Sequence, residues 1–336
     1  MKIVLKVLKW IGLSIGSLLA LILLSGLAFR LFGPTPQPPG ELVDINGVKL
    51  HINSTGEKNN KPTVVIESGQ GLPSEHFYWL SEGLKDSLRV VRYDRAGIGY
   101  SDLTDAPRDP QTVAKELHQL LEKAGEAPPY IMVGHSFGGL FIRVFADLYP
   151  DEVDALVFVD SSHPDQRERL KMSARKDVSG ILNAAATVAD MGLVALLDRM
   201  NGHMLHVEDF PDEVNNRFYD YTINGKYIRG VRDEVQWDST VYAQARATKD
   251  FGSLPIRVFT ANKKYSGADA STGWLELQAE LAELSTNGQH ILVDGHHNSI
   301  YTKKENADHI CQEIIQLLNE LPTTNQLNNN EYTSYK

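Results

Sequence analysis

Apolar runs alternate with amphipathic stretches along most of this chain, and the alternation predicts its fold class. The runs expected to form buried strands span 62–69, 89–95, 130–136, 155–161, 255–261 and 289–295. Stretches with helical spacing of apolar residues lie at 74–87, 109–125, 137–150, 271–285 and within 303–320. Continuously apolar strands that alternate with helices are typical of a mostly parallel sheet covered on both faces, so we expect an α/β fold.

Local signals predict where several elements begin and end. In ELVDINGVKLHINSTG, Asn46-Gly47 lies between alternating apolar residues, which predicts a β-hairpin. Ser74 is a candidate N-cap for the helix that it begins. Pro110 and Gly125 stand near the two ends of the next helix, as the preferences of helix termini lead us to expect.

The alternation of strands and helices lapses between residues 161 and 255. The intervening residues, 162–253, are expected to form helices and loops. We interpret them as a cap inserted at the C-terminal edge of the sheet, where open α/β sheets bind ligands. The cap contains an apolar segment, 181–200, which we expect to pack on the core or to line a pocket. Asp190 within this segment argues against a second membrane span.

The N-terminal segment has the character of a membrane span. From Trp10 to Phe29 it holds no charged side chain, and at about 1.5 Å per residue it crosses a hydrocarbon core of roughly 30 Å. Lysines precede it at positions 2, 6 and 9, so the positive-inside rule places the N-terminus in the cytoplasm and the rest of the chain outside. We favour an uncleaved signal anchor over a cleaved signal peptide, because the apolar stretch is long and no clear cleavage site follows it.

These patterns give the expected organisation of the chain. Residues 1–9 form a cytoplasmic N-terminus, 10–32 a transmembrane signal anchor and 33–40 a proline-rich linker. The folded domain spans 41–320 and includes the cap, whereas the polar residues 321–336 are expected to be disordered.

Composition narrows the classes of function. The 336 residues include 33 Lys and Arg against 43 Asp and Glu, which gives a net charge of −10. This balance argues against nucleic acid as a partner, because phosphate binding requires clustered positive charge. Cys311 is the one cysteine of the sequence, so neither an intrachain disulfide nor a CxxC metal or redox motif is possible.

The stretch VGHSFGGL carries the main chemical signal. Ser136 follows an apolar strand, precedes a helix and stands between Gly134 and Gly138. This arrangement is typical of a nucleophile elbow, a strained turn that exposes a serine and leaves no room for neighbouring Cβ atoms. Free N–H groups at the start of the next helix point toward the serine, so the amide of Phe137 is a candidate donor to an oxyanion. A glycine-rich connection without chemistry is the alternative interpretation.

Together with YDRAGIGYSD (93–102), this motif resembles the α/β-hydrolase fold superfamily over roughly residues 41–320. The resemblance implies the α/β-hydrolase fold, a mostly parallel central sheet flanked by helices, with a helical cap insertion. It also implies esterase-like serine chemistry. The segment from Asp94 to Ser101 matches the family pattern D-R-x-G-x-G-x-S. We interpret it as a tight loop near the mouth of the site, with no direct chemical role.

The same resemblance implies the second half of an oxyanion hole. Family members usually carry His-Gly after their third strand, and here ESGQGLP has Ser68 in place of the histidine but keeps the glycine, Gly69. Position matching makes the backbone N–H of Gln70 the second donor, beside that of Phe137. An oxyanion hole requires an amide rather than a side chain, so the replacement is tolerable. A simple glycine turn is the alternative.

The family order of catalytic residues is serine, acid, histidine. After the last strand, VDGHHNSIY offers His296 and His297, and we choose His297. For the acid we choose Asp160, which directly follows a strand, over Asp269, which lies far from the end of its strand. A strand end is the more rigid platform of the two.

We therefore expect a serine hydrolase that cleaves carboxylic esters through Ser136, His297, Asp160 and an acyl-enzyme. The reaction needs no cofactor, and we expect no metal site. The apolar cap favours a hydrophobic acyl ester as substrate, and the N-terminal helix a membrane as partner. Two alternatives stay open: a peptidase or amidase of the same fold, and a non-catalytic, membrane-anchored binding protein.

Overall fold

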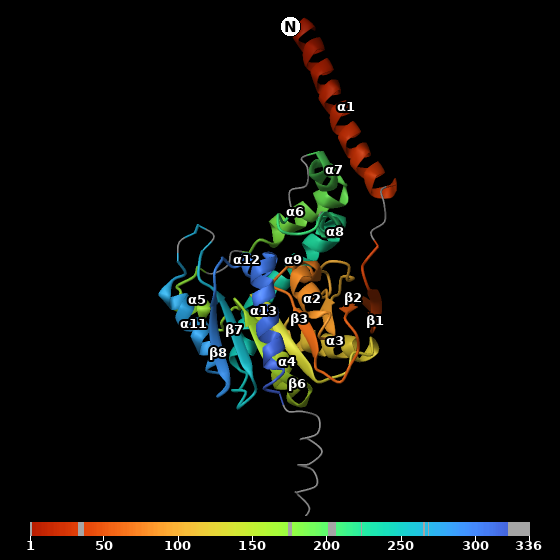
Figure 1. The fold of residues 1–336 in the computed structure, drawn as a ribbon. Helices are drawn as coiled ribbons and strands as arrows, with labels where there is room; N and C mark the ends of the chain where they lie inside the picture. The colour runs from red at the N-terminus through yellow and green to blue at the C-terminus, as the bar shows by residue number, and fades with distance from the viewer. Residues whose placement is uncertain are drawn as a thin grey trace, which may run out of the picture.

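An eight-stranded sheet forms the centre of the molecule, with the strand order β1-β2-β4-β3-β5-β6-β7-β8 (Figure 1). The pairs β1–β2 and β2–β4 are antiparallel, and every other neighbouring pair is parallel. The sheet therefore confirms the fold class expected from the alternation of apolar runs. The strands are β1 (Glu41–Ile45), β2 (Val48–Thr55), β3 (Thr63–Glu67), β4 (Val90–Tyr93), β5 (Tyr130–His135), β6 (Val153–Val159), β7 (Ile256–Ala261) and β8 (Gly288–Val293).

The computed structural model describes residues 2–32, 37–173, 177–200, 206–222, 224–264, 266–267 and 269–321. Part of the expected linker, 33–36, and all of the expected disordered tail beyond residue 321 lie outside these ranges.

Two apolar clusters hold helices against the sheet, one on each face. Neighbouring residues of β5 alternate between the clusters, because Met132 belongs to the first and Ile131 and Val133 belong to the second. The first cluster includes side chains of α3 (Pro110–Lys123), α4 (Gly138–Leu148) and α11 (Thr272–Ala282), and the second those of α2 (Tyr78–Leu84), α12 (Ser299–Thr302) and α13 (Lys304–Leu317). The result is the three-layered arrangement that the pattern predicts.

The residues between β6 and β7 form a helical cap at the edge of the sheet where these strands end (Figure 1). One of the cap helices, α9, meets the loop after β4 backbone to backbone. A Cβ atom added at Gly230 would lie only 2.2 Å from the carbonyl oxygen of Gly97, so both positions require glycine. The cap helices are α5 (Gln166–Arg169), α6 (Ser179–Asp190), α7 (Leu193–Met200), α8 (Asp212–Thr222), α9 (Gly225–Gln236) and α10 (Asp238–Arg246).

The local signals in the sequence have different outcomes. The hairpin forms as predicted, with Asn46 and Gly47 at φ of 56° and 90° in the turn between β1 and β2. The N-cap at Ser74 is wrong. That residue begins a short 3₁₀ helix, Ser74–Phe77, and its N–H donates to the carboxylate of Asp94 while its hydroxyl caps nothing. The predicted helix 74–87 is accordingly split into this turn and α2.

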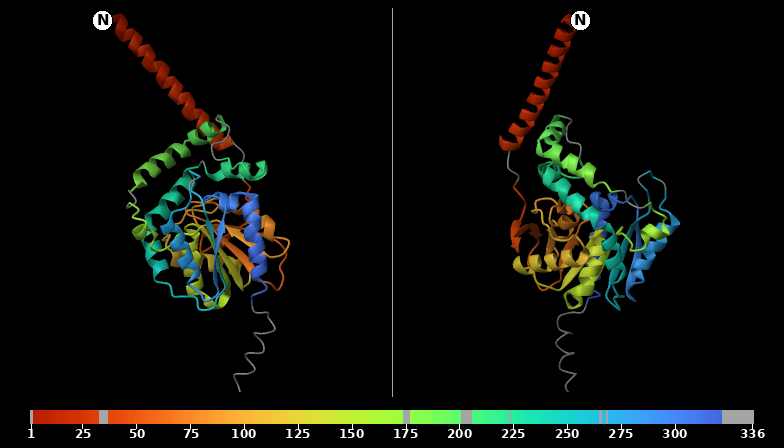
Figure 2. Two further views of the ribbon diagram at one scale, coloured as in Figure 1. Left: turned by 60° about the vertical axis from the view of Figure 1, so that its left-hand side comes forward. Right: turned by 180° about the vertical axis from the view of Figure 1, so that it is seen from behind.

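The helix α1 (Lys2–Phe32) projects away from the domain (Figure 2). Its segment Lys2–Ala28 is long and apolar enough to cross a membrane, with a mean hydropathy of 2.2, and 6% of its most apolar stretch is buried. The expected apolar N-terminal helix is therefore present.

A buried ion pair fixes the loop after β4. His51 on β2 and Asp94 are 0% and 1% exposed, and the imidazole Nδ1 lies 2.7 Å from the carboxylate Oδ2. Burial opposes the charge on His51, but Asp94 outweighs it and raises the pKa of the imidazole above its ordinary 6.5. Burial likewise opposes the charge on Asp94, yet His51 and the N–H groups of Ser74 and Tyr100 lower the pKa of the carboxyl below 3.8.

We predict that His51→Gln lowers the free energy of unfolding by about 3 kcal/mol, because it leaves a buried carboxylate without its counter-charge. The loss will be largest between about pH 4 and pH 6.5, where both groups are charged in the folded and the unfolded chain. It will shrink as the pH rises through the raised pKa of His51, and also as the pH falls through the lowered pKa of Asp94.

Denaturant titration across this pH range, with His118→Gln as the control, measures the effect. His118 forms a half-exposed pair with Glu152 at 2.9 Å, and such pairs contribute at most about 1 kcal/mol. Equal losses in the two variants, or a loss at His51 that does not vary with pH, would contradict the prediction.

Candidate functional site

Ser136 lies in the turn between β5 and α4, where its backbone takes a left-handed conformation with a φ of 52°. The turn is tightly packed. A Cβ added at Gly134 would lie 2.8 Å from backbone atoms of Gly138, and one added at Gly138 would lie 2.3 Å from the carbonyl oxygen of Glu67. Glycine on both sides of the serine is thus a steric requirement of this turn.

The imidazole of His297 lies between Ser136 and Asp160. Its Nε2 is 3.0 Å from the hydroxyl oxygen of Ser136, and its Nδ1 is 2.6 Å from Oδ2 of Asp160. A carboxylate only accepts hydrogen bonds, so Nδ1 carries the proton and Nε2 is left to accept from the serine hydroxyl. The His297 side chain is 31% exposed and that of Asp160 is 4% exposed. The carboxylate is therefore shielded from water, whereas a bound molecule can reach the imidazole.

Asp160 is held by more than the histidine. It directly follows β6 with a φ of 43°, and its Oδ1 accepts hydrogen bonds from the backbone N–H of Ala261 at 3.1 Å and from the indole of Trp274 at 3.2 Å. These two donors occupy one carboxylate oxygen and orient the other toward His297.

The two alternative residues lie elsewhere. Asp269 is 86% exposed and pairs with Lys263 at 2.7 Å on the surface. His296 belongs to the turn before α12, where its N–H donates to the hydroxyl of Ser299 at 2.8 Å. Of the four candidates in the two pairs, the structure brings His297 and Asp160 to Ser136.

His135, the residue before the serine, supports the histidine loop. It is 1% exposed, and its Nε2 lies 3.2 Å from the backbone carbonyl oxygen of His297. Burial and the neighbouring His297 lower the pKa of His135 well below its ordinary value. The ring is therefore neutral, and its Nε2–H donates to that carbonyl. Because the contact joins positions far apart in the sequence, the spacing of the motif gave no signal of it.

The loop after β3 lies against the serine. A Cβ added at Gly69 would be 3.3 Å from that of Ser136 and 3.1 Å from Nδ1 of His135. Gln70, the next residue, is partly buried, and its side chain donates to Asp238 of the cap at 2.9 Å. Phe137, the other residue expected to donate, directly precedes α4. The two backbone segments expected to form the oxyanion hole thus both lie next to Ser136.

Arg95 lies beneath this loop and binds its backbone. The guanidinium, 3% exposed, donates to the carbonyl oxygens of Ser68 at 2.7 Å and Gly69 at 2.8 Å. It also forms ion pairs with Glu67 at the end of β3 and with Glu234 of α9, the latter at 2.7 Å. The second oxygen of Glu234 accepts from the N–H of Gly71 at 2.7 Å. The cap and the loop after β3 are therefore joined through one buried cation.

The charges in this cluster depend on each other. Burial opposes the charge on Arg95, but the carboxylates of Glu234 and Glu67 outweigh it and raise the pKa of the guanidinium. Burial raises the pKa of Glu67 despite the ion pair. Arg95 organises this loop through its bonds to the two carbonyl oxygens, a role that our interpretation of its motif did not include. A charged residue within a run of tightly turning glycines was the available signal.

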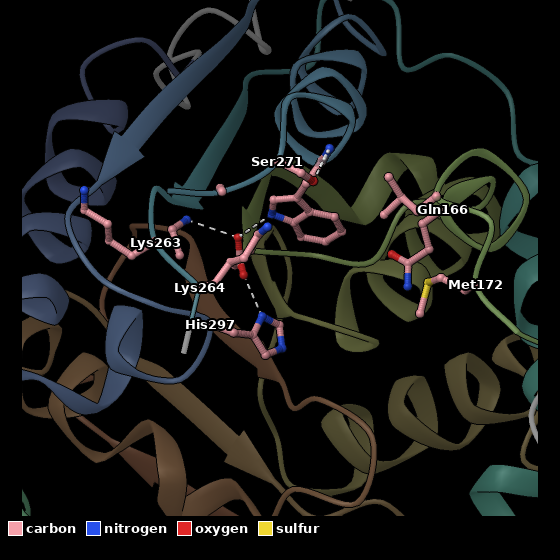
Figure 3. A pocket seen from close by; sticks show the side chains of 11 residues that line it. Gln166, Met172, Lys263, Lys264, Ser271 and His297 are labelled. Atoms are coloured by element: carbon pink, nitrogen blue, oxygen red, sulfur yellow. Dashed lines mark hydrogen bonds and ion pairs between the residues drawn. The ribbon is translucent and has the colours of Figure 1, made fainter. Parts of the chain in front are cut away.

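A cavity of about 490 Å³ opens beside the acid and the histidine (Figure 3). Lys263, Lys264, Ser271 and His297 are drawn around it in Figure 3, with Gln166 and Met172 on the side of the cap. Its apolar wall includes side chains that the sequence analysis did not single out. They are Leu170, Met172, Ala261, Ala270 and Trp274.

The arrangement can transfer a proton from a serine hydroxyl to an imidazole that a buried carboxylate orients. Within the described residues, no three His, Cys, Asp or Glu side chains gather in a way that could hold a metal ion.

One relative of this chain is similar to it over about half of its length. Over 180 residues the chain is 31% identical to the uncharacterized protein YbdG of Bacillus subtilis (strain 168), an alignment that covers 52% of this chain and 55% of YbdG. The chain thus matches about half the length of that relative.

Solved structures share the fold. A putative lipase from Acinetobacter baumannii AYE is similar with a TM-score of 0.60 at 18% identity, over 89% of this chain and 96% of the lipase. A thermophilic esterase from Thermogutta terrifontis gives a TM-score of 0.56 at 18% identity, over 82% and 97% of the two chains. At these identities the likeness shows the fold.

The model of the alpha/beta hydrolase fold family matches residues 62–244, which is more than half of the chain and runs from β3 into α10. Together with the sheet order and the serine turn after β5, this match shows that the chain belongs to the α/β-hydrolase fold family.

Proposed function

We propose that this chain is a serine hydrolase that cleaves carboxylic ester bonds through an acyl-enzyme. The observation that carries the proposal is the continuous contact from Ser136 Oγ through His297 to Asp160, at 3.0 Å and 2.6 Å. A buried carboxylate that orients a histidine against a partly exposed serine is the arrangement that activates a hydroxyl as a nucleophile.

The residues divide the reaction as follows. Nε2 of His297 accepts the Ser136 proton while Oγ attacks the carbonyl carbon, and the N–H groups of Phe137 and Gln70 donate to the resulting oxyanion. The oxyanion collapses, the ester C–O bond breaks, and the imidazolium returns its proton to the departing alcohol. Water then attacks the acyl-enzyme with His297 as base, releases the carboxylic acid and restores the serine. Asp160 stays ionised and stabilises the imidazolium.

The surroundings support a partly hydrophobic substrate at a membrane. The apolar wall of the cavity, with Leu170, Met172 and Trp274, favours an apolar substituent next to His297. The apolar length of α1 supports its role as a membrane anchor, with the N-terminus in the cytoplasm and the hydrolase domain outside.

We predict that a fluorophosphonate probe labels the full chain and that short and medium p-nitrophenyl esters are hydrolysed, because both report an activated serine. Ser136→Ala will abolish labelling and lower turnover by at least about 10³-fold. Ser162→Ala is the matched control, since Ser162 is buried nearby and the substitution keeps its backbone N–H, which donates to the carbonyl oxygen of Ser136 at 2.8 Å.

Parallel assays with amides of the same acyl groups separate the alternatives. Faster cleavage of the amide than of the ester would favour a peptidase or amidase. A folded protein that neither labels nor turns over would favour the non-catalytic binding protein.

Matched pairs of variants test the assignment of Asp160 as the acid and His297 as the base. Asp160→Asn leaves His297 without the carboxylate that fixes its tautomer, so we predict a fall in kcat of about 10³- to 10⁴-fold. Asp269→Asn, on the surface, will change kcat less than about twofold. His297→Ala and His296→Ala should differ in the same way. A larger loss at Asp269 or His296 than at its counterpart would reverse the assignment.

Glu234→Ala removes the carboxylate that holds the N–H of Gly71 and one side of Arg95. We predict a fall in kcat of about tenfold or more, with little change in KM, because a displaced oxyanion donor weakens binding of the transition state more than that of the substrate. Asp233→Ala is the control, since the neighbouring Asp233 forms a partly exposed pair with Arg232 at 2.5 Å. A thermal melt identifies any loss of folding. Equal kcat values in the two variants would contradict a positioning role.

A further inference from the structure

We expected the apolar cap segment 181–200 to pack on the core or to line a pocket, but much of its apolar surface is exposed. It forms two helices, α6 and α7, separated by a turn at Met191 and Gly192. One side of α6 faces outward, with Ile181 72% exposed, Val188 42% and the adjoining Met191 42%. On α7, Leu197 is 53% and Met200 74% exposed. Exposed apolar side chains on consecutive helical elements are uncommon on a water-facing surface and mark an interaction site.

The outer side of α6 carries apolar residues at helical spacing and no charge. Ile181, Ala184, Val188 and Met191 follow one another at intervals of three or four residues, so they share a face. No charged residue occurs from 178 to 189.

The inner side of α6 is already occupied. Ala186 and Ala189 are 1% and 4% exposed, and Asp190 at the end of the helix forms an ion pair with Arg229 of α9. The outer face of α6 is thus the one left for a partner outside the domain.

The membrane-spanning helix touches the same part of the cap. In both views of Figure 2, α6 and α7 lie at the end of α1 that joins the domain. The contact is backbone to backbone, since a Cβ at Gly26 would lie 2.4 Å from the carbonyl oxygen of Met191, and one at Gly192 would lie 2.1 Å from that of Gly26. Gly26 is close to the end of the apolar span, Lys2–Ala28. If that span crosses a bilayer, the turn between α6 and α7 lies at the membrane surface.

We propose that the outer face of α6 and α7 rests on the phospholipid bilayer beside α1, with its apolar side chains inserted at the level of the headgroups. An uncharged apolar face on a helix whose other face packs on protein is suited to this interface. The contact with α1 places the face there, and no second protein is needed to cover it. The cap is then a second membrane contact of the molecule. The proposal rests on the membrane anchorage of α1 proposed above and is independent of the esterase activity.

The test uses the full chain in phosphatidylcholine nanodiscs, with an environment-sensitive fluorophore on single cysteines. Cys311 is replaced first by Cys311→Ala, and the labelled variants are then Ile181→Cys, Val188→Cys, Leu18→Cys and Leu148→Cys. Leu18 reports insertion of α1. Leu148, at the end of α4, is 37% exposed and serves as the apolar control away from the cap. Quenching is measured with a phospholipid that carries a nitroxide near its headgroup, and with aqueous iodide.

We expect the nitroxide lipid to quench the labels at 181 and 188 by about twofold or more, with iodide quenching reduced, as for a helix seated in the interface. The label at 148 should respond only to iodide. If the label at 18 is inserted but iodide quenches the labels at 181 and 188 as strongly as the label at 148, this proposal is overturned and the anchorage of α1 is not. Shielding from iodide without quenching by the lipid would also overturn it, because protein rather than lipid would then cover the face. A label at 18 that stays in water would overturn the anchorage and this proposal together.

Discussion

The backbone of Ser136 can take its left-handed conformation only where the surrounding chain leaves space for it. That space comes from glycines, since side chains at Gly134 and Gly138 would collide with backbone atoms at 2.8 Å and 2.3 Å. The turn directs the serine hydroxyl out of the end of β5 and places the N-terminus of α4 behind it. The histidine and the loop after β3 make their contacts with a serine in this position, and the acid in turn contacts the histidine. The packing of one turn therefore sets the geometry of the whole site.

The sheet topology does the rest of the positioning. Ser136, Asp160 and His297 follow β5, β6 and β8, which run parallel to one another. Their C-terminal ends consequently lie at one edge of the sheet, and three residues separated by up to 161 positions meet there. A loop at the end of a buried parallel strand has little freedom at its first residue, and this favours Asp160 over Asp269 as a fixed partner for the histidine.

The sequence was informative where the physical signal is local. Strand and helix alternation, the hairpin at Asn46-Gly47 and the strand–turn–helix pattern at Ser136 are all read from neighbouring residues. Contacts across the fold were not accessible. Arg95 and Glu234 are 139 positions apart, and no local pattern links them. Ser74 shows the same limit. The helix that it was expected to cap begins at Ser74 itself, and its N–H donates to Asp94, a residue that follows another strand.

The link from Arg95 through Glu234 to the cap has a consequence for the order of events. The carboxylate that accepts from the N–H of Gly71 belongs to α9, so a cap that lifted from the sheet would withdraw that acceptor and the counter-charge of Arg95 in one movement. The loop beside the serine would lose part of its support in the open form. A large molecule would then enter in the open state, through the lifted cap. Chemistry at the serine would belong to the closed state. The site would be complete only after the cap has closed, so closure would select for substrates small enough to fit beneath it.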